Sequence, residues 1–448
     1  MSNEEQAVRL NTITESINSG ALLRAKLILN GLHPAEIARL LESSPPRQRR
    51  IIWEMLDHKN DGSVLVEVGD EVRSHLMESM DERSLIAATE GLDVDDLADL
   101  LVELPRTVIE QALAGMDHQY RARLESVMNY PEDTAGGLMN TDTITIRPDV
   151  TLDVVLKYLR LRGQMPPNTD NIIVVDQYNH YLGILSVTSL VCNDPEQTVS
   201  ETMSKQDIVI KANSSANEVV NIFEDRDLIS APFIDEDNLL VGRITIDDVV
   251  DVIREESEST VLNMAGLTDE EDAFAPVIPS ARRRAIWLGI NLITALIAAG
   301  VISLFQSTIE QVVALAVLMP VVASMGGIAG LQTLTLVIRG IALGNIAKEN
   351  AKPLLIKELM VGVLNSILWA SIIGTLSSYW FDNYMIGLVI GFAMIANLAF
   401  AALSGVAIPI FLKKIGVDPA LAGGVILTTI TDVVGFFSFL GLGSLLLL

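Results

Sequence analysis

The chain is poor in cysteine and in positive charge. Its 448 residues include one cysteine, Cys192, and 31 lysines and arginines against 57 aspartates and glutamates, a formal charge of −26. A single cysteine excludes an internal disulfide and a CxxC metal site. Nucleic-acid binding needs clustered positive charge, so this balance argues against it. The first 30 residues lack a basic start followed by an apolar run, so no signal peptide is expected.

Sequence motifs of enzymes are also missing. The chain contains no P-loop, no GxSxG and no recognisable pairing of a nucleophile with a base. Its five histidines are scattered without metal-ligand spacing. We therefore do not expect an enzyme.

The acidic charge is confined to one part of the chain. Residues 285–448 contain six basic and six acidic residues, so residues 1–284 carry the whole charge of −26. Half of all residues are hydrophobic, and the mean hydropathy is +0.39. An acidic part joined to a neutral, apolar part predicts several domains rather than one globular unit.

The apolar part contains five stretches long enough to cross a bilayer. Each exceeds the roughly 20 residues that a membrane-spanning helix needs. The stretches are 285–305, 312–338, 359–381, 383–412 and 419–448. Buried helices of a large soluble protein are the alternative, but five such runs within 164 residues favour a membrane bundle.

Basic residues in the short loops predict the orientation. They lie at 282–284, between the second and third spans, and at Lys413 and Lys414, whereas the other two loops contain only Glu310 and Asp382. Because loops rich in lysine and arginine lie on the cytoplasmic side of a membrane protein, the N-terminus is expected inside and Leu448 outside. The acidic part then faces the cytosol.

Asp432 is the one charge within the fifth span. It lies about 20 Å along the helix axis at 1.5 Å per residue, near the bilayer centre. An ionised carboxylate there is costly unless it is hydrated or paired, and no basic residue lies inside a span to pair with it. A protonated, structural aspartate is one interpretation. We favour a carboxylate that lines a wet path and faces a cation, because Thr428, Thr429 and Thr431 are polar neighbours. Two subunits that meet there would suit a divalent ion.

Residues 1–130 follow a helical pattern with an internal repeat of 60 residues. His33–Pro45 aligns with Asp93–Pro105, and in each copy an acidic opening precedes an apolar face and a closing proline. This predicts a helical repeat array. Asp95, Asp96 and Asp99 share one helix, and their spacing alone favours a solvated face with favourable helix-start charges.

A second repeat lies between residues 140 and 255. Asp170–Val191 aligns with Leu228–Val250, and each copy predicts a strand, a turn, a second strand and a helix. The pattern resembles a tandem pair of CBS domains, which commonly bind adenine nucleotides. Thr245 and Asp248 match that family's ribose-contacting pattern, whereas the first copy has Ser186 and Ser189. At most one ATP site is therefore expected.

Acidic residues crowd the segment after the second copy. They are Asp247, Asp248, Asp251, Glu255, Glu256 and Glu258. On one helix, Asp248, Asp251 and Glu255 repel at spacings of three and four. The segment is a solvated linker or a place where divalent ions, which prefer carboxylate oxygens, compensate the charge.

These features together resemble the MgtE family of magnesium transporters and channels over essentially the whole chain. The segments that carry the resemblance are Tyr130–Met139, the CBS pair, Pro320–Gly344 and Gly416–Phe437. The resemblance implies a homodimeric, multi-domain membrane protein: an all-α N-terminal superhelical domain, α+β tandem CBS domains and an all-α transmembrane bundle of five helices.

The resemblance also implies boundaries. They are a cytosolic N domain at 1–130, CBS domains at 131–199 and 200–256, a plug helix and linker at 257–284, and the membrane domain at 285–448. The plug helix itself is expected at about 257–267.

By motif position the resemblance implies roles for single residues. Asp432 binds hydrated Mg²⁺ in the pore, and Asp418 is a further metal ligand at its cytosolic entrance. Cytosolic Mg²⁺ bridges acids of the N domain and of the CBS domains and closes the pore. The regulatory ligands are Asp95, Asp99, Asp248, Asp251 and Glu256.

Three positions depart from the family pattern. Ile328 and Leu331 stand where the second-span motif usually has asparagine, and Gly424 replaces a position that is often asparagine. These changes bear on selectivity more than on the fold. The sequence therefore leaves open a broader divalent transporter of Co²⁺, Mn²⁺ or Ni²⁺, and a membrane-bound metal or nucleotide sensor that conducts nothing.

Overall fold

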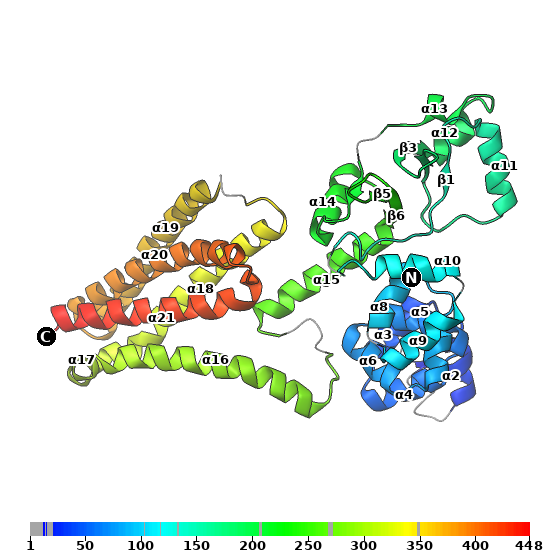
Figure 1. The fold of residues 1–448 in the computed structure, drawn as a ribbon. Helices are drawn as coiled ribbons and strands as arrows, with labels where there is room; N and C mark the ends of the chain where they lie inside the picture. Colours follow the sequence, from blue (N-terminus) through cyan, green and yellow to red (C-terminus); the bar gives the residue numbers. More distant parts are fainter. Residues whose placement is uncertain are drawn as a thin grey trace. The chain divides into compact units, whose positions relative to one another are not determined.

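The computed structural model describes residues 12, 13, 15, 21–102, 104–116, 118–131, 134–205, 208–267, 272–346 and 350–448. They form two compact units, one within Met1–Glu256 and Glu270–Ala275, the other within Ser257–Asp269 and Pro276–Leu448. Figure 1 shows their helices and strands.

The first unit begins with short helices, as the 60-residue repeat predicts. They are α2 (Leu22–Leu29), α3 (Pro34–Glu42), α4 (Pro46–Glu54), η1 (His58–Asn60), α5 (Asp61–Glu67), α6 (Asp70–Glu78), α7 (Glu82–Ala88), α8 (Val94–Val102), α9 (Arg106–Gly115) and α10 (His118–Val127). The aligned segments become α3 and α8. Their apolar faces, including Leu41 and Leu101, are buried in one shared core. At the start of α3, the Glu36 carboxylate accepts the His33 amide at 3.0 Å, which satisfies a backbone donor that the helix itself leaves unpaired.

The second repeat folds into two matching three-stranded sheets. The first contains β1 (Thr145–Ile146), β2 (Asn171–Val175) and β3 (Tyr181–Ser186), and the second β4 (Ile210–Lys211), β5 (Ser230–Ile234) and β6 (Leu240–Thr245). In each sheet the first strand is parallel to the central one and the last is antiparallel. The helices of this region are α11 (Leu152–Arg162), α12 (Val187–Cys192), α13 (Val199–Thr202), α14 (Ala216–Arg226) and α15 (Ile246–Met264).

The two sheets meet through equivalent turns. Tyr181 N donates to Asn238 O at 3.1 Å, and Leu240 N donates to Asn179 O at 3.0 Å. Asn179 and Asn238 both adopt positive φ, a conformation that asparagine tolerates better than most residues. The sequence repeat is therefore also a structural one, with reciprocal contacts between its copies.

The Tyr130–Met139 motif joins the helical region to the second sheet. The Tyr130 ring packs edge-on against Phe233, with centroids 5.7 Å apart, and lies over the bare backbone of Gly136. Gly242 is also required, because a Cβ there would come 2.5 Å from Met139 Cγ. Beyond the motif, Asn140 exchanges two backbone hydrogen bonds with Arg243 of β6, at 2.8 and 2.9 Å. The glycines therefore let the segment around Asn140 lie directly against β6.

Among its described residues, the second unit contains five helices long and apolar enough to cross a membrane. They are α16 (Val277–Ser303), α18 (Val313–Ala342), α19 (Ala351–Trp380), α20 (Tyr384–Lys414) and α21 (Pro419–Leu446), with the short α17 (Gln306–Gln311) between the first two. α16 and α19 begin about eight residues before the apolar stretches do, because charged residues are tolerated at the end of a spanning helix. Lys348, one of the bases used for the orientation, lies outside the described residues.

Candidate ion pathway and acidic cluster

Asp432 lies on a half-exposed stripe of α21. Gly424, Thr428 and Asp432 recur at spacings of four, so they share one helix face. Thr431, next to Asp432, is fully buried, whereas Asp432 itself is half-buried. Within the part of the chain that the structure describes, the Asp432 carboxylate has no hydrogen-bond or ion-pair partner. This carboxylate is therefore available to a ligand.

Glycines set the register between α18 and α21. Each of four glycines faces a side chain of the other helix: Gly330 with Leu427, Gly423 with Leu334, Gly435 with Val322, and Gly443 with Leu315. Residue numbers rise along α18 as they fall along α21, so the two helices are antiparallel. Interpolation along this seam places Asp432 level with Met325.

The departures from the family motif lie on the outer face of α18. Ile328 is 56% exposed and Leu331 is 46% exposed, and the polar Ser324 and Thr335 share that exposed face. In a single protomer, Ser324 and Thr335 of α18 and the stripe of α21 that carries Asp432 are thus not buried within the bundle.

A buried carboxylate that sequence reasoning missed lies in α19. Glu358 is 6% exposed, its Oε1 pairs with Lys357 Nζ at 2.7 Å, and its Oε2 accepts the Thr333 hydroxyl at 3.4 Å. The sequence places Glu358 just before an apolar stretch, among loop charges. Its burial follows from the early start of α19, which no local pattern indicates.

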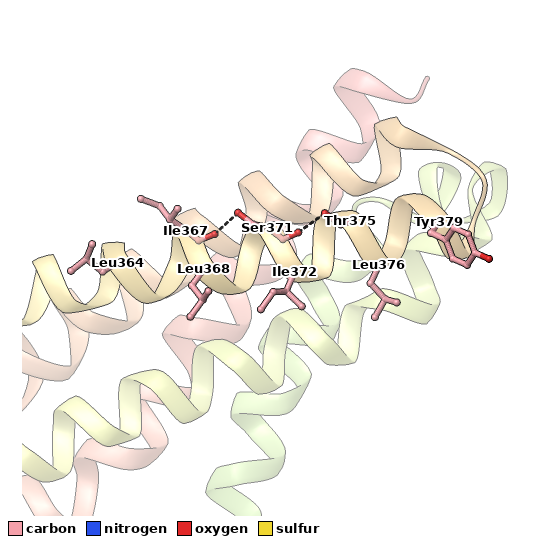
Figure 2. A pocket seen from close by; sticks show the side chains of 8 residues that line it. All are labelled: Leu364, Ile367, Leu368, Ser371, Ile372, Thr375, Leu376 and Tyr379. Carbon is pink, nitrogen blue, oxygen red and sulfur yellow. Dashed lines mark hydrogen bonds between the residues drawn. The ribbon is translucent and has the colours of Figure 1, made fainter.

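A pocket on α19 is not an ion site. Leu364, Ile367, Leu368, Ser371, Ile372, Thr375, Leu376 and Tyr379 line it, all from α19 (Figure 2). The Ser371 and Thr375 hydroxyls donate to the carbonyls of Ile367 and Ser371 of the same helix, at 2.7 and 2.8 Å. This face carries no charge and suits apolar surroundings.

The first unit brings acids of α8 and α15 together. Asp95 is buried, and its Oδ1 accepts the Asn140 amide at 3.3 Å. Burial and the neighbouring Asp93 raise the pKa of Asp95 to about 6. Burial, Asp95 and Asp247 raise the pKa of Asp248 to about 8. The charge of the predicted ligand Asp95 therefore acts on the predicted ligand Asp248.

Further acids surround this pair, and several were not in the predicted set. Burial and the charge of Asp95 raise the pKa of Asp96 to about 7. Burial raises the pKa of Asp251, and burial with the charge of Asp251 raises that of Glu67 in α5. The predicted ligands Asp99 and Glu256 are half-buried on α8 and α15. Asp93 opens the second copy of the 60-residue repeat, and this position was the sequence signal that could have placed it among these acids. Glu67 had none, because its neighbour Asp251 is distant in the chain.

These acids repel one another without forming a closed cage. Among the described residues, no three aspartate, glutamate, histidine or cysteine side chains converge to hold a metal ion. The donor set is nevertheless one of carboxylate oxygens, which suits a hard, hydrated cation.

Thr245 and Asp248, the predicted nucleotide pair, contact each other. The Thr245 hydroxyl donates to Asp248 Oδ2 at 2.9 Å, and Thr245 is 5% exposed. Asp248 thus serves both the acidic cluster and this pair.

The last turns of α15 reach the membrane helices within the second unit. Asn263 Nδ2 donates to Asp418 Oδ2 at 3.1 Å, while Asp418 Oδ1 caps α21 by accepting the Ala420 amide at 2.8 Å. Met264 packs against a cluster that contains Leu334 and Leu412. The segment expected as a plug helix is therefore continuous with α15, and its end lies beside Asp418.

Helices long and apolar enough to cross a membrane, joined to two matching three-stranded sheets and an acidic helical domain, define a multi-pass membrane protein. Residues 319–442 match the family model MgtE, described as a divalent cation transporter, residues 32–133 match the MgtE intracellular N domain, and residues 135–193 and 199–255 match the CBS domain. The chain belongs to the MgtE transporter family.

Curated relatives match along nearly the whole chain. The chain is 28% identical over 442 residues to "Magnesium transporter MgtE" of Thermus thermophilus, covering 97% of this chain and 98% of that protein. It is 27% identical over 428 residues to the protein of the same name from Bacillus subtilis, covering 96% and 95%. A solved structure, the cytosolic domain of the Mg²⁺ channel MgtE in complex with ATP, aligns with a TM-score of 0.49 at 27% identity, covering 54% of this chain and 99% of that one.

Proposed function

We propose that this protein transports Mg²⁺ across the cell membrane and that Asp432 is the carboxylate of its pathway. The half-buried, unpartnered carboxylate of Asp432 is the observation that carries the proposal. Near-full-length relatives named as magnesium transporters support the choice of ion. Mg²⁺ sheds its waters reluctantly, so a single carboxylate beside threonine hydroxyls suits a hydrated ion.

The proposed transporter is a homodimer. In one protomer, the polar Ser324 and Thr335 of α18 and Thr428 of α21 are exposed, although both helices belong to the membrane bundle. Polar groups in a membrane helix are costly toward lipid, so these faces favour a second copy or a water-filled path. With the cytosolic N-terminus and external Leu448 that the basic loops predict, the path would cross the cell membrane along the dimer axis.

Flux through the full chain in liposomes tests the proposal. Asp432→Asn keeps the shape and removes the charge, so it is expected to lose most Mg²⁺ influx, measured with an entrapped Mg²⁺ indicator. Asp382→Asn is the matched control, because Asp382 is a loop acid with positive φ that asparagine also tolerates. Equal flux for wild type and Asp432→Asn overturns the role of Asp432. No flux from wild type favours the non-conducting sensor.

We further propose that cytosolic Mg²⁺ closes the pathway through α15. Asp248 and Asp251 lie on the same helix as Asn263, whose side chain contacts Asp418 at the start of α21. A cation held among Asp95, Asp99, Asp248, Asp251 and Glu256 would replace repulsion by attraction. It would thereby fix α15. Asp418, which caps α21 and contacts Asn263 near the end of α15, would be a further ligand.

ATP binding is the remaining proposal and concerns the Thr245–Asp248 pair. Because Asp248 also belongs to the acidic cluster, a nucleotide and a regulatory cation would act on one carboxylate. Protection of the full chain against thermal unfolding by ATP, lost in Thr245→Val, is the expected result. Equal protection of the variant would place the nucleotide elsewhere.

A further inference from the structure

Asn397 is a fully buried amide in the middle of α20. Its Nδ2 donates to the Val322 carbonyl of α18 at 2.8 Å, and it is 0% exposed. Its Oδ1 meets no hydrogen-bond donor in the described part of the chain. A buried amide oxygen without a partner is unfavourable, and a leucine of similar size would avoid that cost. Filling space alone therefore does not account for this asparagine.

The amide packs against glycine backbone of two other helices, at Gly326 of α18 and Gly435 of α21. A Cβ at Gly326 of α18 would overlap the Asn397 amide, and a Cβ at Gly435 of α21 would come 2.8 Å from Nδ2. Gly435 also faces Val322, the residue whose carbonyl accepts the hydrogen bond. One side chain of α20 thus touches both α18 and α21 at their mutual contact.

This junction lies at the level of Asp432. Gly435 follows Asp432 by three residues, which is less than one turn and about 4.5 Å along α21. Asp432 is level with Met325, beside Gly326, along the α18–α21 seam. A small shift of α21 at Gly435 would therefore displace the Asp432 carboxylate directly.

We propose that Asn397 is a positioning residue of the transport pathway. By contacting both α18 and α21, it sets the position of α21 and thereby that of the Asp432 carboxylate. The inference rests on the proposed function, since Asp432 is the carboxylate that it positions. Asn397 does not touch the ion. Its hydrogen bond to Val322 sets the distance between the helices, and the two glycines make that distance short.

Thiol labelling tests the position of residue 432 without using transport. In a Cys192→Ser background, Asp432→Cys is exposed to a charged, membrane-impermeant methanethiosulfonate reagent, with Asn397 intact or as Asn397→Leu, in the full chain in liposomes. The expected result is a change of about tenfold in the labelling rate of residue 432, which corresponds to a difference of roughly 1.4 kcal/mol in the activation free energy of labelling. Thr335→Cys, on the exposed face of α18, should keep its labelling rate, because general loosening would change both.

The second test measures Mg²⁺ flux through Asn397 variants that keep the native Asp432. Asn397→Leu is expected to lower the maximal Mg²⁺ flux by about tenfold, whereas Ser366→Ala should retain it. Ser366 is the matched control because it is equally buried, but its hydroxyl donates within α19, to Val363 O at 2.7 Å. If Asn397→Leu does not fold, Asn397→Asp, which has the same shape, is measured in the same way and is expected to lose flux too.

The outcomes separate the two proposals. Unchanged labelling and unchanged flux in the Asn397 variants overturn the positioning role and leave Asp432 as it is. If the thiol of the Asp432→Cys variant is not labelled with Asn397 intact, and Asp432→Asn conducts normally, the proposed pathway fails instead. Parallel changes at positions 432 and 335 would make Asn397 a general packing residue and overturn the inference.

Discussion

The guanidinium of Arg49 and the carboxylate of Asp272 form an ion pair at 2.8 Å, and both side chains are only 5% exposed. Arg49 lies in α4, and its Nε also donates to the Leu41 carbonyl at 2.9 Å. Glu71 accepts the backbone amide of Asp272 at 2.7 Å. The acidic helical region therefore holds the segment that immediately precedes α16.

We predict that Asp272→Ala strongly destabilises this region. Removing one partner of a buried ion pair leaves an uncompensated charge, which costs about 3–5 kcal/mol. The measurement is denaturant unfolding of the full chain in detergent micelles. Asp153→Asn is the control, because Asp153 and Lys157 pair at 2.5 Å on the exposed surface, where such pairs contribute less than about 1 kcal/mol. Equal stability of the two variants would mean that Arg49 is solvated.

The raised pKa values predict coupling between protons and cations. The folded-state pKa of Asp248 is about 8, above its ordinary 3.8, so the folded chain binds protons more tightly than the unfolded one. Without cations, this group makes the fold less stable as the pH rises from about 4 to 8. A cation needs the ionised carboxylates, so Mg²⁺ should bind more tightly at pH 8 than at pH 6.

Proton release on Mg²⁺ addition measures this coupling. In weak buffer at pH 7, the wild-type chain in micelles should release protons, and Asp248→Asn should release fewer. At about pH 9.5, above the three raised pKa values of about 6, 7 and 8, the release should vanish. A release that is equal at both pH values would place the cation away from this cluster.

We predict that asparagine at Ile328 and Leu331 sharpens selectivity for Mg²⁺. Both side chains are exposed on α18 and cannot hydrogen-bond the water shell that Mg²⁺ retains. The double variant should raise the ratio of Mg²⁺ to Co²⁺ or Mn²⁺ flux in liposomes. Asparagine at Leu336, exposed on α18 but not at a motif position, is the control. An unchanged ratio would show that residues 328 and 331 do not face the ion.

We predict that Mg²⁺ protects residues 250–284 from protease. The segment should resist cleavage in millimolar Mg²⁺ and become labile in EDTA. Asp95→Ala with Asp248→Ala should stay labile and conduct at high Mg²⁺. Several weak Mg²⁺ sites together are enough to close the gate. Moving a two-state gate from mostly open to mostly closed takes about 5.5 kcal/mol of differential binding, which several sites can share. Equal cleavage in both conditions would contradict gating by this cluster.

The elements that the sequence predicted well rest on local, periodic properties. A bilayer requires long apolar helices, so α16, α18, α19, α20 and α21 follow from hydropathy. The 60-residue repeat predicted α3 and α8, and the CBS repeat predicted the two matching sheets. α15 was expected as two parts, yet no proline or glycine interrupts residues 246–264, and it forms one helix.

Which distant groups share a site was decided by the tertiary structure. Asp95 and Asp248 become neighbours because Asn140 pairs with β6 and Tyr130 packs on Phe233, contacts that no local pattern encodes. Asn397 is buried because glycines let α18, α20 and α21 approach closely, and the same approach sets the level of Asp432, whereas the early start of α19 buries Glu358. Sequence alone predicted the membrane spans, the repeat helices and two of the three strands in each sheet, because those depend on neighbouring residues. The pairing of charges and amides across elements depends on long-range packing, and only the folded chain fixes it.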